Sequence, residues 1–158
     1  MQPAFDHARG AGLSLAYRMA LPDSPPLVTV LIVEDHPESR EGIAEYLTLC
    51  GFQVTTAADG LEGVEVARRT HPDVIVMDLA MPKLDGWEAT RRLKADWSTR
   101  NIPIIALSAF GNQEEARALA MALGCAGMLT KPVQPHIVQE SIRIAAAAHF
   151  AEVPEEQN

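Results

Sequence analysis

From residue 27 onward, short apolar runs alternate with longer stretches in which apolar residues recur every three or four positions. The run 28–33 consists of β-branched residues and leucine, which is typical of a strand buried on both faces. The other predicted strands cover 52–57, 74–77, 102–107 and 126–129. The predicted helices cover about 37–50, 61–70, 85–96, 112–123 and 135–150.

Residues with strong turn or capping preferences separate these elements. Pro37 suits the first turn of a helix, and Asp85 can cap the helix that follows it. Gly51 and Gly124 each follow a predicted helix and are expected to end it. Strands that alternate with helices in this way indicate an α/β domain with one parallel sheet and helices on both faces.

The regular pattern covers residues 27–150, which we interpret as one domain. Residues 1–26 end in the proline-rich segment 22–26 and are expected to form a flexible extension. Residues 151–158 form an acidic tail with three glutamates and no basic residue. Met19 is a candidate alternative start to Met1.

The charge and the cysteine content exclude several classes of protein. The chain has 21 acidic and 13 basic residues, a net charge of −8, which argues against a nucleic-acid-binding role. No apolar run is long enough to cross a bilayer, and no segment has the charge pattern of a signal peptide. Cys50 and Cys125 have neither the spacing of a zinc site nor the number for a disulfide framework, so buried thiols in a reducing compartment are expected. We therefore predict a cytoplasmic protein that binds neither nucleic acid nor membrane.

Polar residues that can carry chemistry follow four of the five predicted strands. Glu34 and Asp35 follow the first strand, Asp78 the third, Ser108 the fourth and Lys131 the fifth. Parallel strands end at one edge of the sheet, so these side chains are expected to converge there. Three carboxylates so close together repel one another, and a hard divalent cation such as Mg²⁺ would relieve that repulsion. Together with a lysine and a hydroxyl, an aspartate free to attack suits the acceptance of a phosphoryl group.

The segments around these residues resemble the receiver domain of the response regulators of two-component signalling. The matching segments, in the family's order, are 31–35 (LIVED), 74–86 (VIVMDLAMPKLDG), 104–109 (IIALSA) and 124–132 (GCAGMLTKP). The resemblance covers about 27–150 and implies a doubly wound, five-stranded parallel sheet with the flavodoxin-like strand order 2-1-3-4-5.

The resemblance also implies a metal site and a phosphoacceptor. Asp78 would be the phosphoacceptor, and Asp35 and Asp78 would bind Mg²⁺ together with the backbone carbonyl of Ala80. Glu34 would support the metal through water. Each of these acids also has a structural interpretation, as a helix cap or a solvated loop residue.

The same resemblance implies a set of groups that hold the phosphoryl oxygens. Ser108 would donate a hydrogen bond, Lys131 would pair with an oxygen, and the backbone N–H groups of Ala80 and Ala109 would assist. The bond between Lys131 and Pro132 would be cis, which would direct the lysine into the site.

Two positions depart from the family's usual pattern. Met128 stands where a tyrosine or phenylalanine normally couples phosphorylation to a surface change, and Phe110 could supply an aromatic ring instead. Ala80 and Phe110 stand where the family controls access of water to the acyl phosphate. Because both are apolar, we expect the phosphorylated protein to lose its phosphate slowly.

The resemblance implies a single-domain response regulator that signals by protein contact or by passing phosphate along a relay. It would not be a classical enzyme, although it would promote its own phosphotransfer and dephosphorylation. The expected phosphodonor is a sensor histidine kinase or a histidine phosphotransfer protein. The alanine-rich stretch 112–148 is expected to bind a downstream protein or a second copy of the chain. The main alternative is a pseudo-receiver that acts without phosphorylation. A haloacid-dehalogenase-like phosphatase would need an aspartate at Ala80, and a flavin carrier would need a phosphate-binding loop in place of 34–37.

The histidines and tryptophans are interpreted as structural residues. The five histidines show no metal-ligand spacing along the sequence and are expected at the surface or in packing contacts. Trp87 and Trp97 are expected to pack against the domain.

Overall fold

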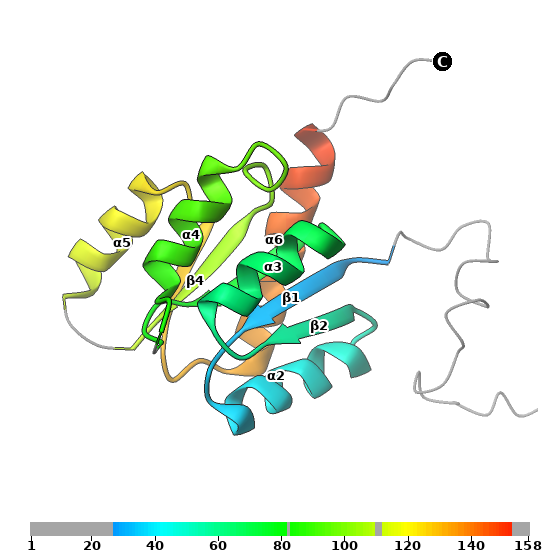
Figure 1. The fold of residues 1–158 in the computed structure, drawn as a ribbon. Helices are drawn as coiled ribbons and strands as arrows, with labels where there is room; N and C mark the ends of the chain where they lie inside the picture. The colour runs from blue at the N-terminus through cyan, green and yellow to red at the C-terminus, as the bar shows by residue number, and fades with distance from the viewer. Residues whose placement is uncertain (1–26, 82, 110–111, 153–158) are drawn as a thin grey trace, which may run out of the picture.

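The chain forms alternating strands and helices in a computed structural model that describes residues 27–81, 83–109 and 112–152 (Figure 1). In chain order, the described elements are β1 (Thr29–Val33), α2 (Pro37–Leu49), β2 (Gln53–Ala57), α3 (Gly60–Thr70), β3 (Val74–Asp78), α4 (Gly86–Ala95), β4 (Ile104–Ser108), α5 (Gln113–Ala122), β5 (Gly127–Thr130) and α6 (Pro135–Glu152). Each lies within about two residues of its predicted bounds. The interpretations of 1–26 and of 153–158 fall outside the described residues, and α6 runs two residues into the predicted tail.

The strands form one parallel sheet in the order β2-β1-β3-β4-β5, which confirms the predicted fold class. The chain moves from β1 outward to β2 and then returns past β1 to β3, so the strand order reverses beside β1. Loops after β1 and β3 therefore diverge to opposite faces of the sheet. The crevice that opens between them is where sheets of this kind place their ligands.

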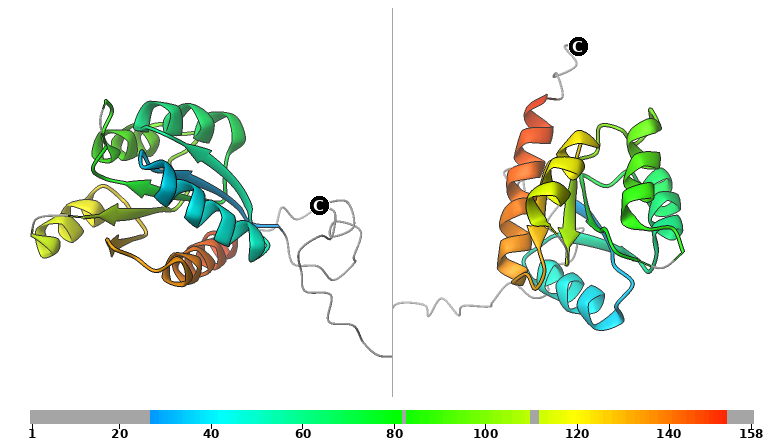
Figure 2. Two further views of the ribbon diagram at one scale, coloured as in Figure 1. Left: turned by 90° about the horizontal axis from the view of Figure 1, so that it is seen from below. Right: turned by 90° about the vertical axis from the view of Figure 1, so that its left-hand side faces the viewer.

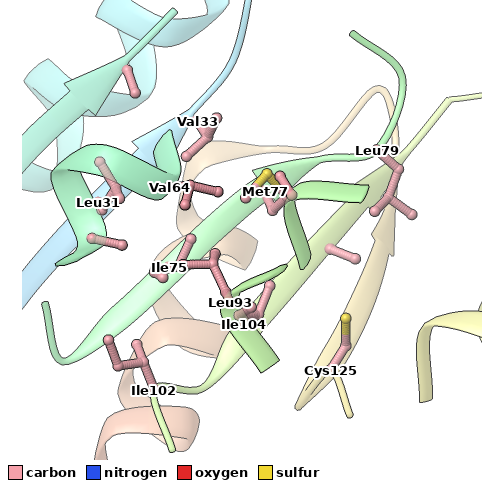
Figure 3. Close-up of a cluster of buried hydrophobic side chains, with 14 of the residues drawn as sticks. Leu31, Val33, Val64, Ile75, Met77, Leu79, Leu93, Ile102, Ile104 and Cys125 are labelled. Atoms are coloured by element: carbon pink, nitrogen blue, oxygen red, sulfur yellow. The ribbon is translucent and has the colours of Figure 1, made fainter. Parts of the chain in front are cut away.

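Helices cover both faces of the sheet (Figure 2). Helices α2 and α6 pack on one face, where Leu47 and Ile142 join the side chains of Val30 and Ile32. Helices α3, α4 and α5 cover the other face over a second apolar cluster, part of which Figure 3 shows. Strands β3 and β4 are buried along their whole length, which explains their uninterrupted apolar sequences.

The predicted helix caps are present. The Asp85 carboxylate accepts a hydrogen bond from the backbone N–H of Glu88 at 2.8 Å, and Pro37 occupies the first turn of α2. Gly51 and Gly124 follow α2 and α5 with φ angles of 97° and 94°, a conformation that glycine adopts without strain. Local sequence signals therefore place the helix ends as expected.

Trp97 corrects one of the predictions, because its side chain is exposed (81%) instead of packed. It lies just after α4 in a tight turn, in which the Asp96 carboxylate accepts hydrogen bonds from the N–H and the hydroxyl of Ser98. The hydroxyl of Thr99 closes the turn by donating to the carbonyl of Leu93 at 2.7 Å. The turn is held by these polar groups, which leaves the indole in solvent. Trp87, by contrast, packs against the core as expected.

Two further expectations concern the cysteines and the membrane. Cys125 is buried in the core as predicted, whereas Cys50 is only half-buried. Among the helices in the described part of the chain, none combines the length and the apolar character that a membrane span requires.

Candidate functional site

The strand register brings the predicted site residues to one edge of the sheet. Val33 pairs with Met77, so the next residue of each chain segment, Glu34 and Asp78, lie at the same level. On the other side of β3, Ser108 pairs with Thr130, so Lys131 emerges beside it. The backbone N–H of Lys131 donates to the carbonyl of Ser108 at 2.8 Å. Residues far apart in sequence therefore meet because four parallel strands end together.

Two buried carboxylates share one lysine at the centre of this edge. Glu34 is fully buried and Asp78 is 2% exposed. Lys131 Nζ donates to Glu34 Oε2 at 2.6 Å and to Asp78 Oδ2 at 3.0 Å. The ammonium group thus lies between two carboxylates that would otherwise repel each other at close range.

This arrangement shifts the pKa values of the lysine and of one acid. Burial raises the pKa of Glu34, and the charge of Asp78 adds to this, although the hydrogen bond from Lys131 acts in the opposite direction. Burial alone would lower the pKa of Lys131, but its hydrogen bonds to Glu34 and Asp78 outweigh that effect and raise it. The lysine is therefore held in its charged form.

The backbone around Asp78 is held on both sides. Its second oxygen, Oδ1, accepts a hydrogen bond from the backbone N–H of Ala80 at 3.0 Å. The N–H of Leu79 donates to the carbonyl of Leu107 at 2.9 Å, and the N–H of Gly86 donates to the carbonyl of Leu79 at 3.2 Å. Gly86 lies so close to Asp78 that a Cβ atom there would overlap the Asp78 carbonyl oxygen. The carboxylate is thus presented from a rigid segment.

A cleft of about 500 Å³ opens beside the lysine. It lies between α2 and the segment that joins β5 to α6. Its lining residues are Glu34, Glu38, Ser39, Gly42, Ile43, Leu107, Ala109, Lys131, Pro132, Val133 and Pro135. Ser108 and Ala80 are not among these lining residues; Ser108 is buried and Ala80 is exposed. The Lys131–Pro132 peptide bond is cis, as the family resemblance implied.

The first loop contains two features that the sequence analysis missed. Ligand atoms of Glu34, Asp35 and His36 lie within 4.8 Å of one another, although the histidine spacing predicted no ligand role for His36. Arg40 Nη1 donates to the carbonyls of Glu34 at 3.0 Å and of Asp35 at 3.5 Å, and so braces the loop. The signal for the first feature was available, because three consecutive residues with metal-binding side chains follow the strand. Spacing between histidines alone does not reveal it.

The donor set fits a hard divalent cation. Glu34, Asp35 and Asp78 supply carboxylate oxygens at one edge of the sheet, and oxygen ligands are those that Mg²⁺ prefers. Glu34 and Asp78 are linked by Lys131, which donates a hydrogen bond to each carboxylate. The Asp35 carboxylate lies close to that of Glu34.

The structure describes Met128 but not Phe110, the residue that could replace it as an aromatic. Met128 is 3% exposed and lies in the core beneath α5, so it is not a surface residue. Phe110, the candidate aromatic replacement for it, lies outside the described residues.

A doubly wound sheet that gathers acids, a hydroxyl and a lysine at its carboxyl edge is the architecture of a phosphorylation-dependent signalling domain. The comparisons agree. Residues 30–143 match the model of the response regulator receiver domain, and the chain belongs to that family.

Relatives of known name span most of this chain. The polar-differentiation response regulator DivK of Brucella ovis is 32% identical over 115 residues, which cover 73% of this chain and 93% of DivK. Protein PilH of Pseudomonas aeruginosa is 36% identical over 121 residues, which cover 77% of this chain and 99% of PilH. The chain is thus a response regulator homologous to single receiver domains, a class of signalling proteins and not of classical enzymes.

One related solved structure contains a bound metal ion. The receiver domain of the sensor histidine kinase PA1611 from Pseudomonas aeruginosa is 34% identical, with a TM-score of 0.69. The alignment covers 77% of this chain and 99% of that domain. In that structure a magnesium ion is coordinated in the active-site cleft.

Proposed function

We propose that Asp78 accepts a phosphoryl group from a phosphohistidine of a sensor histidine kinase or a histidine phosphotransfer protein. The observation that carries this proposal is the Asp78 carboxylate itself. It is buried, rigidly presented and hydrogen-bonded by Lys131 and by the N–H of Ala80 at the edge of the sheet. A carboxylate that is buried and held in this way differs from a solvated surface carboxylate, and it is well positioned to act as a nucleophile.

The transfer is a simple displacement at phosphorus. The phosphohistidine of the donor carries a proton on its other ring nitrogen. One oxygen of Asp78 attacks the phosphorus atom, the phosphorus–nitrogen bond breaks, and its electron pair stays on the imidazole nitrogen. The product is an acyl phosphate on Asp78 and a neutral histidine. Lys131 and the hydroxyl of Ser108 bind phosphoryl oxygens, helped by the backbone N–H groups of Ala80 and Ala109.

A Mg²⁺ ion is the cofactor that this donor set favours. Asp35 and Asp78 would hold it with the carbonyl of Ala80, and Glu34 would support it through water. When bound, the cation supplies positive charge that offsets repulsion between the carboxylates and the incoming phosphoryl oxygens. Lys131 supplies one positive charge beside the two carboxylates of Glu34 and Asp78. The addition of a dianionic phosphoryl group therefore requires further positive charge.

The two proposed partner surfaces lie in different places. The phosphodonor would bind at the cleft beside Lys131, which has α2 and the β5–α6 segment as its walls and whose lysine contacts Asp78. The surface of α5, β5 and α6 within 112–148 serves the downstream protein, or a second copy of the chain. It exposes Leu119, Met121 and Ile144. Buried Met128 lies beneath α5, where a change of rotamer would reposition that helix.

We further propose that the protein acts in the cytoplasm and catalyses its own slow dephosphorylation. Ala80 is exposed two residues after Asp78, and its methyl side chain offers no hydrogen bond to an attacking water. A pseudo-receiver has less support, because Glu34, Asp78 and Lys131 are all present and in contact.

Intact mass after incubation with phosphoramidate tests the proposal. Wild-type protein with Mg²⁺ should gain about 80 Da, the mass of one phosphoryl group, and should not do so when EDTA removes Mg²⁺. Asp78→Asn should abolish the gain. Asp85→Asn is the matched control, because Asn caps a helix as well as Asp and Asp85 lies in the same loop region. Absence of the adduct in folded wild-type protein, or its persistence in Asp78→Asn, would contradict the proposal.

A further inference from the structure

The loop between β1 and α2 brings an imidazole to the acidic edge of the site. His36 is the N-cap of α2, and its backbone N–H donates to Glu34 Oε1 at 3.2 Å. This turn, followed at once by Pro37 at the start of the helix, places a ring nitrogen of His36 within 4.8 Å of carboxylate oxygens of Glu34 and Asp35. The His36 side chain is exposed and makes no capping hydrogen bond, so the ring is free to turn toward an ion.

We propose that His36 is a further metal ligand, and that Glu34, Asp35 and His36 together bind a transition-metal ion such as Ni²⁺ or Zn²⁺. The inference rests on the proposed function only in taking Asp35 as a metal ligand. Mg²⁺ is bound through oxygen and gains little from an imidazole, whereas Ni²⁺ and Zn²⁺ bind imidazole nitrogen strongly. One nitrogen donor therefore changes which ion the site selects.

The triplet of Glu34, Asp35 and His36 can bind an ion without Asp78. Their ligand atoms lie within 4.8 Å of one another, and Asp78 is not part of that group. The transition-metal ion would share Asp35 with Mg²⁺, so the two ions would compete. An ion such as Ni²⁺ would in this way oppose Mg²⁺-dependent phosphorylation at Asp78.

Positive charges nearby limit the affinity for any cation but not the selectivity. Lys131 Nζ contacts Glu34, Arg40 Nη1 contacts the carbonyls of Glu34 and Asp35, and the amino-terminal end of α2 adds a partial positive charge. These groups repel Mg²⁺ and Ni²⁺ equally, because the two ions carry the same charge. A difference between the ions must therefore come from the ligand atoms, and His36 is the nitrogen ligand of the triplet.

Calorimetric titration of the untagged full chain with NiCl₂ and, separately, with MgCl₂ tests this inference. In His36→Ala, the Kd for Ni²⁺ should rise at least about tenfold. Loss of a residue that only hydrogen-bonds to a metal ligand already weakens metal binding by about that factor, and loss of a ligand should cost at least as much. The Kd for Mg²⁺ should stay unchanged within error. The matched control is His71→Asn, at the exposed end of α3, because Asn tolerates the left-handed conformation of that residue. It should leave both values unchanged.

The outcomes separate this inference from the phosphoacceptor proposal. If Ni²⁺ binds wild type and His36→Ala equally well, or if both ions weaken together, His36 is not a ligand and the inference is wrong. Asp78→Asn should lose phosphorylation but still bind Ni²⁺, and complete loss of Ni²⁺ binding in this variant would also overturn the inference. If the phosphoramidate adduct is absent but the Ni²⁺ result holds, the phosphoacceptor proposal fails and the metal inference stands.

A second readout depends on position and not on affinity. Ni²⁺ is paramagnetic, so a small amount should broaden the imidazole NMR signals of His36 before those of His71 or His136. Equal broadening of all three rings would indicate non-specific binding and contradict the inference.

Discussion

The start of α4 lies very close to the end of β3 at Gly86, and substitution of this glycine tests how Asp78 is held. A Cβ atom added to Gly86 would overlap the carbonyl oxygen of Asp78 and lie 2.6 Å from the Cα of Leu79. Both are backbone atoms, so no side-chain rotation can relieve the overlap. Gly86→Ala must therefore move the start of α4 away from the end of β3.

The size of the effect follows from comparison with a second glycine. Overpacking of this kind typically lowers the free energy of unfolding by about 1–3 kcal/mol. Gly42, in the middle of α2, has no atom within 4 Å of the place that a Cβ would take. Gly42→Ala should instead stabilise the protein by about 0.5–1 kcal/mol, because alanine restricts the unfolded chain. The same chemical change thus has opposite signs at the two positions.

Urea denaturation followed by circular dichroism measures both variants. For an m-value of about 2 kcal/mol/M, the two midpoints should differ by about 1–2 M, with wild type between them. Gly86→Ala should also slow phosphorylation by phosphoramidate, since the displaced segment carries Asp78. If both variants shift the midpoint in the same direction by similar amounts, the close approach of α4 to β3 does not hold the site as we argue.

Three further predictions concern charge and water at named positions. Lys131→Met should lower the free energy of unfolding by about 2–3 kcal/mol near pH 7.5, less than for a fully buried pair because the lysine is 24% exposed. The loss should shrink toward about pH 5, since burial raises the pKa of Glu34 and a proton bound there in the folded variant replaces the charge of the ammonium; a loss that grows in acid would contradict this. Asp96, whose pKa is lowered chiefly by its bond to a backbone N–H, should stabilise wild type over Asp96→Asn at neutral pH. That advantage should disappear in denaturation curves as the pH falls below the ordinary pKa of 3.8 through the lower folded value; an advantage independent of pH would refute it. Ala80→Asn should speed the loss of phosphate, followed by intact mass over time, because the amide can hydrogen-bond an attacking water. An unchanged or slower rate would contradict the idea that the apolar side chain of Ala80 slows hydrolysis.

The charge arrangement explains why this site suits a switch. Lys131 offsets two buried carboxylates in the resting protein, with hydrogen bonds to Glu34 and Asp78. A phosphoryl group on Asp78 would draw the ammonium toward its own oxygens and leave Glu34 to other cations. Lys131 would therefore pair with Glu34 and Asp78 in the unphosphorylated protein and with the phosphoryl oxygens in the phosphorylated protein.

The sequence alone was sufficient for the order of the elements and for the edge at which the site lies. Apolar runs such as 74–77 are buried on both faces of a sheet, and residues such as Asp85 cap helices through local hydrogen bonds. Both signals act over a few residues, so they can be read without the fold. Parallel strands then require Asp78, Ser108 and Lys131 to converge, because their carboxyl ends share one edge.

Only the tertiary structure decided which groups touch. Lys131 reaches Glu34 across 97 positions of sequence, and Gly86 abuts Asp78 because α4 packs against the end of β3. Trp97 is exposed because polar contacts hold its turn, although its side chain alone predicted burial. His36 faces the carboxylates because the turn before Pro37 folds back on itself. These contacts depend on how whole elements pack, and periodicity along the chain carries no information about distances across it.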